Sequence, residues 1–184
     1  MGLVPPISSE GRGKYAGNPI VILGGSSSVG QNGTLAYHLL KGATSNIDYS
    51  AIQLAKLSGF SPIVTTASLK HADYLKSLGA THVIDRSVPA SVLASEISSI
   101  TQNGPIKYAV DSISEPHTQQ NGHDLLAPGG QLAVFGPVAA KTTEEKDVFL
   151  VYGSLRHPPN IELLETFYHD NLEQLLKEGA IKVS

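Results

Sequence analysis

Short hydrophobic runs recur along the chain, and polar or turn-forming residues bound most of them. Each run has the length of a single strand; they are Ile20 to Leu23, Pro62 to Ala67, His82 to Ile84, Tyr108 to Val110, Gln131 to Phe135 and Val148 to Tyr152. Short bounded runs of this kind are typical of buried β-strands. The pattern therefore predicts six strands.

Between these runs, hydrophobic residues recur at helical spacing and glycines follow as stop signals. The predicted helices are Ala51 to Leu57, Ala72 to Leu78, Val92 to Ile100, Thr118 to Leu126 and Ile161 to Lys177, with stops at Gly59, Gly79, Gly104, Gly129-Gly130 and Gly179. This alternation predicts an α/β fold, a doubly wound and mostly parallel six-stranded Rossmann sheet. Its ligand would lie beyond the carboxyl ends of the strands.

The domain organisation follows from the same pattern. Residues 1–18 are rich in glycine, proline and serine without a sustained period, so we expect a linker there. Residues 19–184 are expected to form a single domain, because a 184-residue chain with 41% hydrophobic composition can bury one sizeable core.

Composition and charge exclude several classes of partner. The net charge of −3 and the pI near 6.1 leave no broad basic field, so we expect neither nucleic acid nor a membrane surface as a partner. The absence of cysteine excludes disulfides and thiolate metal sites and suits a reducing compartment. No signal or membrane-spanning stretch is visible near the N-terminus, so we expect a cytoplasmic protein. Homo-oligomer formation stays open.

A glycine-rich turn follows the first strand. Diphosphate binding needs a tight strand-to-helix turn whose backbone N–H groups approach the phosphate oxygens. The candidate cofactor-binding residues there are Gly24, Gly25, Ser26, Ser27, Ser28, Val29 and Gly30. A structural turn without a ligand is the alternative, but the position after the first strand of an alternating chain favours nucleotide binding.

The end of the second strand indicates which nucleotide is bound. An acidic residue there would bind a free ribose 2′-hydroxyl, whereas cationic and hydroxyl groups suit a 2′-phosphate. The segment from Thr65 to His71 contains Ser68 and Lys70 but no acid before Asp73. It therefore favours NADP (NADPH) over NAD. In the alternative reading, Ser68 caps the following helix and Lys70 is merely solvated.

Several blocks of sequence in the same order resemble the cofactor domain of medium-chain dehydrogenase/reductases. The blocks are "GKYAGNPIVILGGSSSVGQ", "AIQLAKLSGFSPIVTTAS", "LKSLGATHVIDRS", "YAVDSIS" and "LLAPGGQLAVFGP". They are most similar to the zinc-independent quinone-reductase and fungal trans-enoyl-reductase branch, often labelled zinc-binding oxidoreductases or ToxD-like proteins. The resemblance covers most of residues 14–182.

The resemblance implies a set of cofactor contacts. Gly24 and Gly30 match the outer glycines of the family's loop, while Ser27 replaces its middle glycine. The 2′-phosphate contacts would fall on Ser68, Lys70 and His71. Further cofactor-facing groups would stand at strand ends, at Asp85-Arg86, Asp111-Ser112, Phe135-Gly136-Pro137 and Gly153-Ser154. A helix cap at Asp111 and a plain turn at Gly136-Pro137 are the alternatives, and none of these residues is assigned a catalytic role.

The family's reaction is hydride transfer from NADPH to an enoyl, quinone or similar activated C=C or C=O substrate. This branch needs no zinc. The seven histidines, His117, His123, His157 and His169 among them, show no metal-ligand spacing, so we expect no metal site.

Two departures bear on activity. Residues 32–50 stand between the glycine turn and the helix block, where the family runs on almost directly; they could extend a first helix, bulge beside the phosphate site, or be a gene-model artefact. The family's N-terminal GroES-like catalytic domain also has no counterpart here. We therefore expect an isolated cofactor domain, and whether it is itself an enzyme stays open.

Other functions remain as rivals. A non-catalytic dinucleotide-binding or oligomerisation module would use the same fold without hydride transfer. A short-chain dehydrogenase is disfavoured, because the Tyr37 and Lys41 pair lies just after the glycine turn, and that family's pair comes several strands later. A methyltransferase would want an acid closing the second strand, which instead ends at Ala67-Ser68.

Overall fold

A computed structural model describes residues 11–25, 47–151, 169 and 171–182. The described residues form a six-stranded sheet in the order β3-β2-β1-β4-β5-β6, with every neighbouring pair parallel. The strands are β1 (Ile20–Leu23), β2 (Ile63–Ala67), β3 (His82–Asp85), β4 (Tyr108–Asp111), β5 (Gln131–Val134) and β6 (Asp147–Leu150). The predicted doubly wound Rossmann sheet is therefore confirmed.

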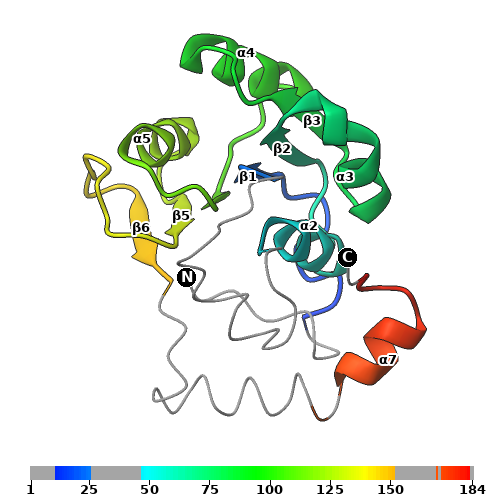
Figure 1. Cartoon of the computed structure of the whole chain (residues 1–184). Helices are drawn as coiled ribbons and strands as arrows, with labels where there is room; N and C mark the ends of the chain where they lie inside the picture. Colours follow the sequence, from blue (N-terminus) through cyan, green and yellow to red (C-terminus); the bar gives the residue numbers. More distant parts are fainter. Residues whose placement is uncertain (1–10, 26–46, 152–168, 170, 183–184) are drawn as a thin grey trace.

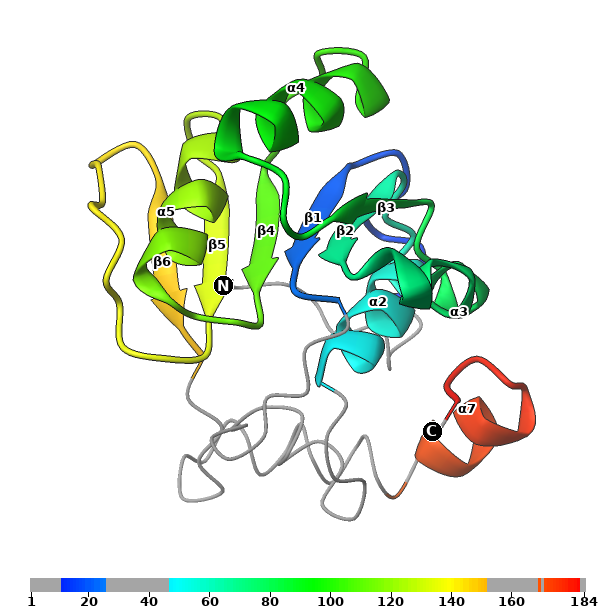
Figure 2. The ribbon, with the colours of Figure 1, turned by 45° about the horizontal axis from the view of Figure 1, so that its top comes forward.

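Helices connect the strands and cover both faces of the sheet (Figure 1). They are α2 (Ile47–Leu57), the short 3-10 helix η1 (Leu69–His71), α3 (Ala72–Leu78), α4 (Ala90–Ile100), α5 (Pro116–Leu125) and α7 (Leu172–Lys177). Helices α2 and α3 lie on one face, and α4 and α5 lie on the other (Figures 1 and 2).

The hydrophobic core has two halves because successive side chains of a strand point to opposite faces. In β1, Ile20 and Ile22 pack with residues of α2 and α3, whereas Val21 and Leu23 pack with residues of α4. All four side chains are buried. A strand covered on both faces must be hydrophobic throughout, which explains why β1 reads as a continuous apolar run.

Two of the helices begin two residues before their predicted starts. Helix α4 begins at Ala90, two residues before Val92, and α5 begins at Pro116, two residues before Thr118. In α5 the missed signal was Pro116, which suits the first turn of a helix because its nitrogen has no hydrogen to leave unpaired. The backbone N–H of Glu115 donates to Thr118 Oγ1 at 3.1 Å and closes this helix start.

Helix α2 begins at Ile47, inside the segment 32–50 that interrupts the family blocks. The end of that segment is therefore helical and continuous with the predicted helix from Ala51. Residues 26–46 lie outside the described residues. So does most of the predicted span Ile161 to Lys177, of which the structure describes a helix over α7.

The described part of the expected linker packs against the domain. The ring of Tyr15 stacks on Phe60 with centroids 4.8 Å apart, and both rings meet Tyr108 edge-on. The backbone N–H of Tyr15 donates to the Ser58 carbonyl oxygen at 2.9 Å. A Cβ on Gly59 would come within 2.8 Å of the Gly13 backbone, so the approach is close. Residues 11–18 thus contact the sheet and α2 through Tyr15 and Gly13.

The last described residues pack on α2. The buried Gln53 amide pairs with Lys182, accepting from its N–H at 2.5 Å and donating to its carbonyl oxygen at 3.3 Å. Leu175 and Ile181 are buried there beside Leu54 and Leu57. Residues 171–182 are therefore held by both a polar and an apolar contact.

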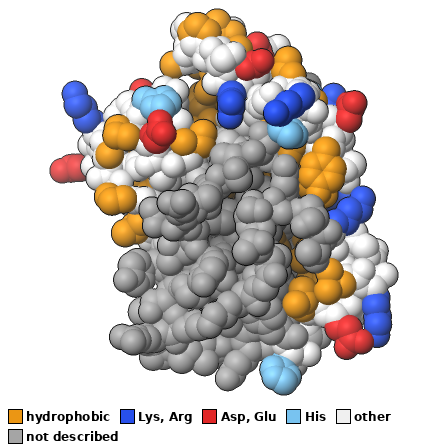
Figure 3. All heavy atoms as spheres, in the orientation of Figure 1, with side chains coloured by type: hydrophobic (Ala, Val, Ile, Leu, Met, Phe, Trp, Pro, Cys, Tyr) orange, Lys and Arg blue, Asp and Glu red, His pale blue; other side chains and the backbone are white. Residues whose placement is uncertain are grey.

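On the face shown in Figure 3, the Lys and Arg side chains of the described residues are interspersed with acidic ones. Within the described ranges, no helix has the length and apolar character needed to cross a bilayer.

Candidate functional site

The candidate site lies where the carboxyl ends of the parallel strands meet, at one edge of the sheet (Figure 2). Strands β1 and β4 are neighbours there, yet the chain continues from β1 towards α2 on one face and from β4 into α5 on the other. Such a reversal opens a crevice outside the strand ends, and ligands of doubly wound sheets bind in it. The predicted site residues that the structure describes follow strand ends at this edge.

Gly24 and Gly25 form a tight turn after β1. Gly24 has a φ of +89°, and its N–H donates to Thr66 Oγ1 at 3.0 Å. The N–H of Gly25 donates to the Thr66 carbonyl oxygen at 2.8 Å. A Cβ on Gly25 would stand 2.1 Å from Thr65 Oγ1, so only glycine fits.

Both N–H groups are thus satisfied within the protein, and the two glycines shape the turn. Donors to a diphosphate would have to come from the rest of the predicted loop. Its remaining residues Ser26, Ser27, Ser28, Val29 and Gly30 lie outside the described residues, as does Ser154.

Cationic and hydroxyl groups gather at the ends of β2 and β3. Ala67 pairs with Asp85, so Ser68 and Arg86 follow neighbouring strands, and the Arg86 N–H donates to the Ala67 carbonyl oxygen at 3.0 Å. Lys70 and Arg86 are exposed, and His71 is half-buried. In the part of the chain that the structure describes, no carboxylate forms an ion pair with these cations.

The alternative role of Ser68 as a side-chain cap is wrong. Ser68 occupies the residue before η1, but its side chain makes no capping hydrogen bond. Its carbonyl oxygen closes the turn by accepting from the His71 N–H at 2.9 Å. The half-buried hydroxyl is therefore not used to start the helix.

The acid at this corner is engaged by its own loop. Asp85 Oδ1 accepts from the Ser87 hydroxyl at 2.6 Å and from the Ser87 N–H at 2.8 Å. These bonds favour the ionised form, so the Ser87 hydroxyl and then its N–H hold the pKa of Asp85 below its usual value.

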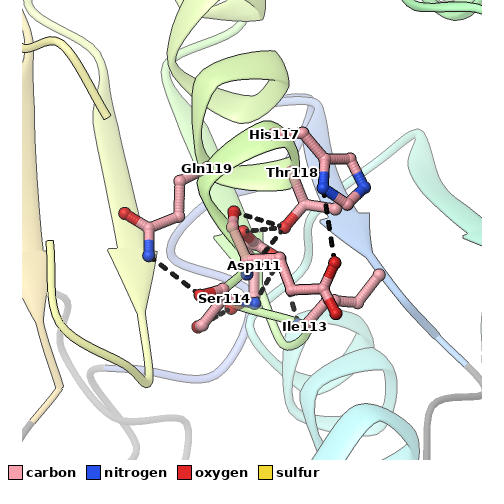
Figure 4. A network of polar contacts seen from close by, with 7 residues as sticks. Asp111, Ile113, Ser114, His117, Thr118 and Gln119 are labelled. Atoms are coloured by element: carbon pink, nitrogen blue, oxygen red, sulfur yellow. Dashed lines mark hydrogen bonds and ion pairs between the residues drawn. The ribbon is translucent and has the colours of Figure 1, made fainter. Parts of the chain in front are cut away.

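Asp111 is fully buried at the end of β4 and organises the loop that follows (Figure 4). Its Oδ1 accepts from the N–H groups of Ile113 and Ser114, both at 3.0 Å, and its Oδ2 accepts from Thr118 Oγ1 at 2.7 Å. The alternative role as a plain helix cap is wrong, because Glu115 holds the cap position. Any effect of Asp111 on a cofactor would pass through this loop.

The same network joins the loop after β4 to the loop after β5. The Ser114 hydroxyl donates to the Asp111 carbonyl oxygen at 2.9 Å and accepts from the Phe135 N–H at 2.7 Å. Gln119, fully buried on α5, donates to the carbonyl oxygens of Ser114 at 3.0 Å and Pro137 at 2.9 Å. Its Oε1 accepts from the Ala139 N–H at 2.7 Å. Gly136-Pro137 is therefore held in place from α5.

Sequence reasoning missed Thr118 and Gln119 as site-building residues. A signal was available, because a helix that packs on a sheet ordinarily turns apolar residues inward. Thr118 and Gln119 are adjacent polar residues on the buried side of α5, which indicates that polar groups of the neighbouring loops form hydrogen bonds with them.

Burial raises the pKa of Asp111 above its usual value of 3.8, against the hydrogen bonds from Ser114, Thr118 and Ile113, which lower it. The folded protein therefore binds this proton more tightly than the unfolded chain does. The stability that protonation contributes is present below pH 3.8 and is lost as the pH rises through the folded-state pKa.

Asp111→Asn is expected to remove this pH dependence, because asparagine does not titrate. The free energy of unfolding of the wild type, relative to the variant, should fall as the pH rises through that window and then stay level. Urea unfolding of both proteins from about pH 3.5 to about pH 7 measures this difference in the free energy of unfolding. If the wild type instead gained stability over the variant as the pH rose, the raised pKa of Asp111 would be contradicted.

One fully buried hydroxyl at the crevice has no hydrogen-bond partner among the described residues. Ser112 follows Asp111, is 1% exposed, and its Oγ makes no hydrogen bond. Its backbone N–H donates to the Leu23 carbonyl oxygen at 3.1 Å, which places it between the ends of β1 and β4. A tight glycine turn, exposed cations and an unpaired buried hydroxyl at one edge fit a phosphate-bearing dinucleotide.

The described residues do not fit a zinc ion. Across the described ranges, no group of three or more His, Cys, Asp or Glu side chains is placed to hold a metal, and the sequence contains no cysteine. No chemical step is therefore assigned to zinc.

Comparisons with known proteins show which family the sequence of this chain matches. The model of the family described as zinc-binding dehydrogenase matches residues 49–166. The match begins after the glycine turn and near the end of segment 32–50.

Fungal relatives are similar in sequence over much of the chain. "Trans-enoyl reductase himH" of Aspergillus japonicus is 38% identical over 123 residues, 66% of this chain and 29% of that protein. "Trans-enoyl reductase FSL5" of Gibberella zeae is 40% identical over 120 residues, 65% of this chain and 27% of that protein. The chain thus spans less than a third of the length of these relatives.

Solved structures share the fold. The CurK enoyl reductase superposes with a TM-score of 0.66 at 17% identity, covering 95% of this chain and 48% of that one. The quinone oxidoreductase of Pseudomonas syringae pv. Tomato DC3000 gives a TM-score of 0.66 at 20% identity, covering 91% and 48%. Identities this low concern the fold alone.

Proposed function

The chain belongs to the zinc-binding dehydrogenase family, as an NAD(P)-binding domain of medium-chain oxidoreductases, and from this premise we propose that it binds NADPH. The observation that carries the preference for NADPH over NADH is the corner where β2 and β3 end. There Ser68 offers a free hydroxyl, and Lys70 and Arg86 offer exposed cations. Such groups suit the extra phosphate of NADPH.

The electrostatics of this corner support the proposal. The acid that binds the ribose hydroxyls of NADH is expected at the end of the second strand. Strand β2 ends at Ala67 and is followed by Ser68, whereas Asp85 stands at the end of β3 and its Oδ1 accepts two hydrogen bonds from Ser87. A 2′-phosphate would bring negative charge to Lys70 and Arg86, neither of which forms an ion pair with a carboxylate among the described residues.

We further propose that the domain serves a reductase of activated alkenes, since the relatives named above are called trans-enoyl reductases. When bound, NADPH supplies a hydride for an activated C=C or C=O bond. The residues of this chain bind and orient the cofactor, and the network of Asp111 and Gln119 holds the strand-end loops against which it lies. Cytoplasmic location and homo-oligomer formation remain predictions.

Lys70→Ala is expected to weaken NADPH binding about 5- to 20-fold, because it removes a charged partner of the phosphate. Binding of NADH should change less than about twofold. Fluorescence titration of the full chain with each nucleotide measures both constants. Lys76→Ala is the matched control, because Lys76 is an exposed cation on α3 away from the corner.

A wild-type chain that binds NADH as tightly as NADPH would contradict the cofactor preference. Turnover is tested separately by following NADPH absorbance with an enoyl thioester or a quinone. Binding without oxidation would assign the chain to a non-catalytic dinucleotide-binding module.

A further inference from the structure

Asparagine followed by glycine occurs three times in this sequence, at Asn32-Gly33, Asn103-Gly104 and Asn121-Gly122. An asparagine side chain can react with the backbone nitrogen of the next residue, and glycine hinders that nitrogen least because it has no Cβ. The first pair lies outside the described residues. The other two are each preceded by glutamine, so the structure around them, more than the local sequence, sets their relative reactivity.

Asn103-Gly104 lies in the turn after α4. Asn103 is exposed and has a φ of +61°. Its N–H donates to the Ser98 carbonyl oxygen at 2.8 Å, and the Gly104 N–H donates to the Thr101 carbonyl oxygen at 2.8 Å. Both bonds belong to a single turn at the surface, which can open locally without unfolding a helix or a strand.

Asn121-Gly122 lies inside α5 instead. Gly122 is buried, and a Cβ there would come within 3.0 Å of Leu132 Cδ1. The glycine therefore allows α5 to lie close to β5, and its nitrogen is fixed in the helix. Asn103 and Asn121 both line the open cavity between α4 and α5, so water reaches each of them. The freedom of the backbone is what distinguishes the two pairs.

A second feature acts on the side chain of Asn103. The Ser98 hydroxyl donates to Asn103 Oδ1 at 2.7 Å. Attack on the Asn103 Cγ places negative charge on this oxygen, and a donor that is already bound to it stabilises the charge. The end of α4 therefore both exposes the reacting group and polarises it.

We propose that Asn103 is a site of spontaneous deamidation, promoted by the Ser98 hydroxyl. The Gly104 nitrogen attacks the Asn103 Cγ and loses its proton, the bond from Cγ to Nδ2 breaks, and Nδ2 leaves as ammonia. The product is a cyclic succinimide. Water then adds to one of the two carbonyl carbons of the ring and opens it to aspartate or isoaspartate, so the reaction needs no oxidant or reductant.

The modification changes the end of α4. Either product carries a carboxylate at the C-terminal end of the helix, where the helix dipole disfavours negative charge. Isoaspartate also lengthens the main chain before Gly104 by one carbon, which moves the Gly104 N–H away from the Thr101 carbonyl oxygen. Asn103→Asp, which carries the charge alone, should lower the melting temperature by about 1–4 °C. An unchanged melting temperature would contradict this consequence.

Peptide mapping of the full chain after storage in mildly alkaline buffer tests the proposal. Trypsin cleaves after Arg86, Lys107 and Lys141, so the two pairs fall in different peptides. Mass spectrometry detects the replacement of the amide by a carboxylate, and chromatography separates aspartate from isoaspartate. Asn103 should convert at least about 10-fold faster than Asn121, because a surface turn opens at a lower free-energy cost than a packed helix. In urea, where α5 is unfolded, the two should convert at similar rates.

Ser98→Ala should slow the conversion of Asn103 about 2- to 10-fold in the folded chain, because the donor to Oδ1 is lost. Ser99→Ala is the matched control, since Ser99 is an exposed serine on the same turn of α4, and it should leave the rate unchanged. An unchanged or faster rate in Ser98→Ala would overturn the role of the hydroxyl.

The site itself is tested by the two asparagines in the folded wild type. A conversion of Asn121 as fast as that of Asn103 would overturn the proposal. So would a folded chain in which Asn103 stays intact over a period in which the chain in urea converts. A preference for Asn103 that is equally large in urea would show that the local sequence is the cause, and would overturn the explanation from the turn.

Discussion

Gly25→Ala is expected to lower the free energy of unfolding by about 1–3 kcal/mol and to abolish the stabilisation by NADPH. The new Cβ would stand 2.1 Å from Thr65 Oγ1, and the Thr65 side chain is fully buried with its hydroxyl donating to the Ile22 carbonyl oxygen at 2.8 Å. Neither group can give way without breaking a buried hydrogen bond or moving the turn. Urea unfolding and the thermal shift with NADPH measure the two effects.

A double-mutant cycle separates the clash from other effects of the substitution. Thr65→Ala alone should destabilise the protein, because the Ile22 carbonyl oxygen loses a partner. In the double variant Gly25→Ala/Thr65→Ala, the contact at 2.1 Å is gone, so the combined loss should be smaller than the sum of the two single losses. Strict additivity would show that the glycine is needed for another reason.

Asp111→Ala is expected to lower the free energy of unfolding by about 2–4 kcal/mol at neutral pH. The change leaves the N–H groups of Ile113 and Ser114 without their acceptor in a partly buried loop. The loss should also loosen the loop after β5, because Ser114 connects the two loops through the Phe135 N–H. Urea unfolding measures the stability, and hydrogen exchange of the Phe135 amide measures the loosening.

Asp111→Asn is the matched control for this variant. Its side-chain oxygen can still accept from Ile113 and Ser114, and its amide group can donate to Thr118 Oγ1 in place of the present bond. The hydroxyl of Thr118 is then free to donate to the Glu115 carbonyl oxygen, which lies 3.0 Å away. The variant should therefore stay within about 1 kcal/mol of the wild type. Equal losses for the alanine and asparagine variants would exclude the hydrogen bonds as the cause.

The fold could be predicted from the sequence because each strand and each helix end is indicated by residues close together in the chain. The continuous apolar run at Ile20 to Leu23 indicates a strand buried on both faces, and the glycine after Leu78 indicates a helix end. The structure bears out both, with Gly79 at a φ of +131°. Helix starts were harder to predict. Glu115 and Pro116 begin α5 through backbone geometry, and the spacing of apolar residues gives no indication of it.

The candidate site was predicted only in outline. The ends of β2, β3, β4 and β5 could be named because parallel strands place them at one edge. The pairing within the site could not be named, since Gln119 follows Ser114 by five residues but bonds to Pro137 and Ala139 across the next strand. The interpretation of residues 1–18 as a linker did not predict the stacking of Tyr15 on Phe60, for the same reason.

Periodicity and turn residues in the chain itself determine the six alternating strands and the edge of the sheet at which a dinucleotide would bind. They do so because the burial of a strand or helix and the geometry of a turn each require particular residue types within a few positions of the sequence. Close approaches between distant residues decide the rest. Thr65 makes Gly25 obligatory, Thr118 bonds to the Asp111 carboxylate, and the Ser112 hydroxyl is buried with no hydrogen-bond partner among the described residues. Such contacts exist only once the sheet has formed, so no local pattern carries them.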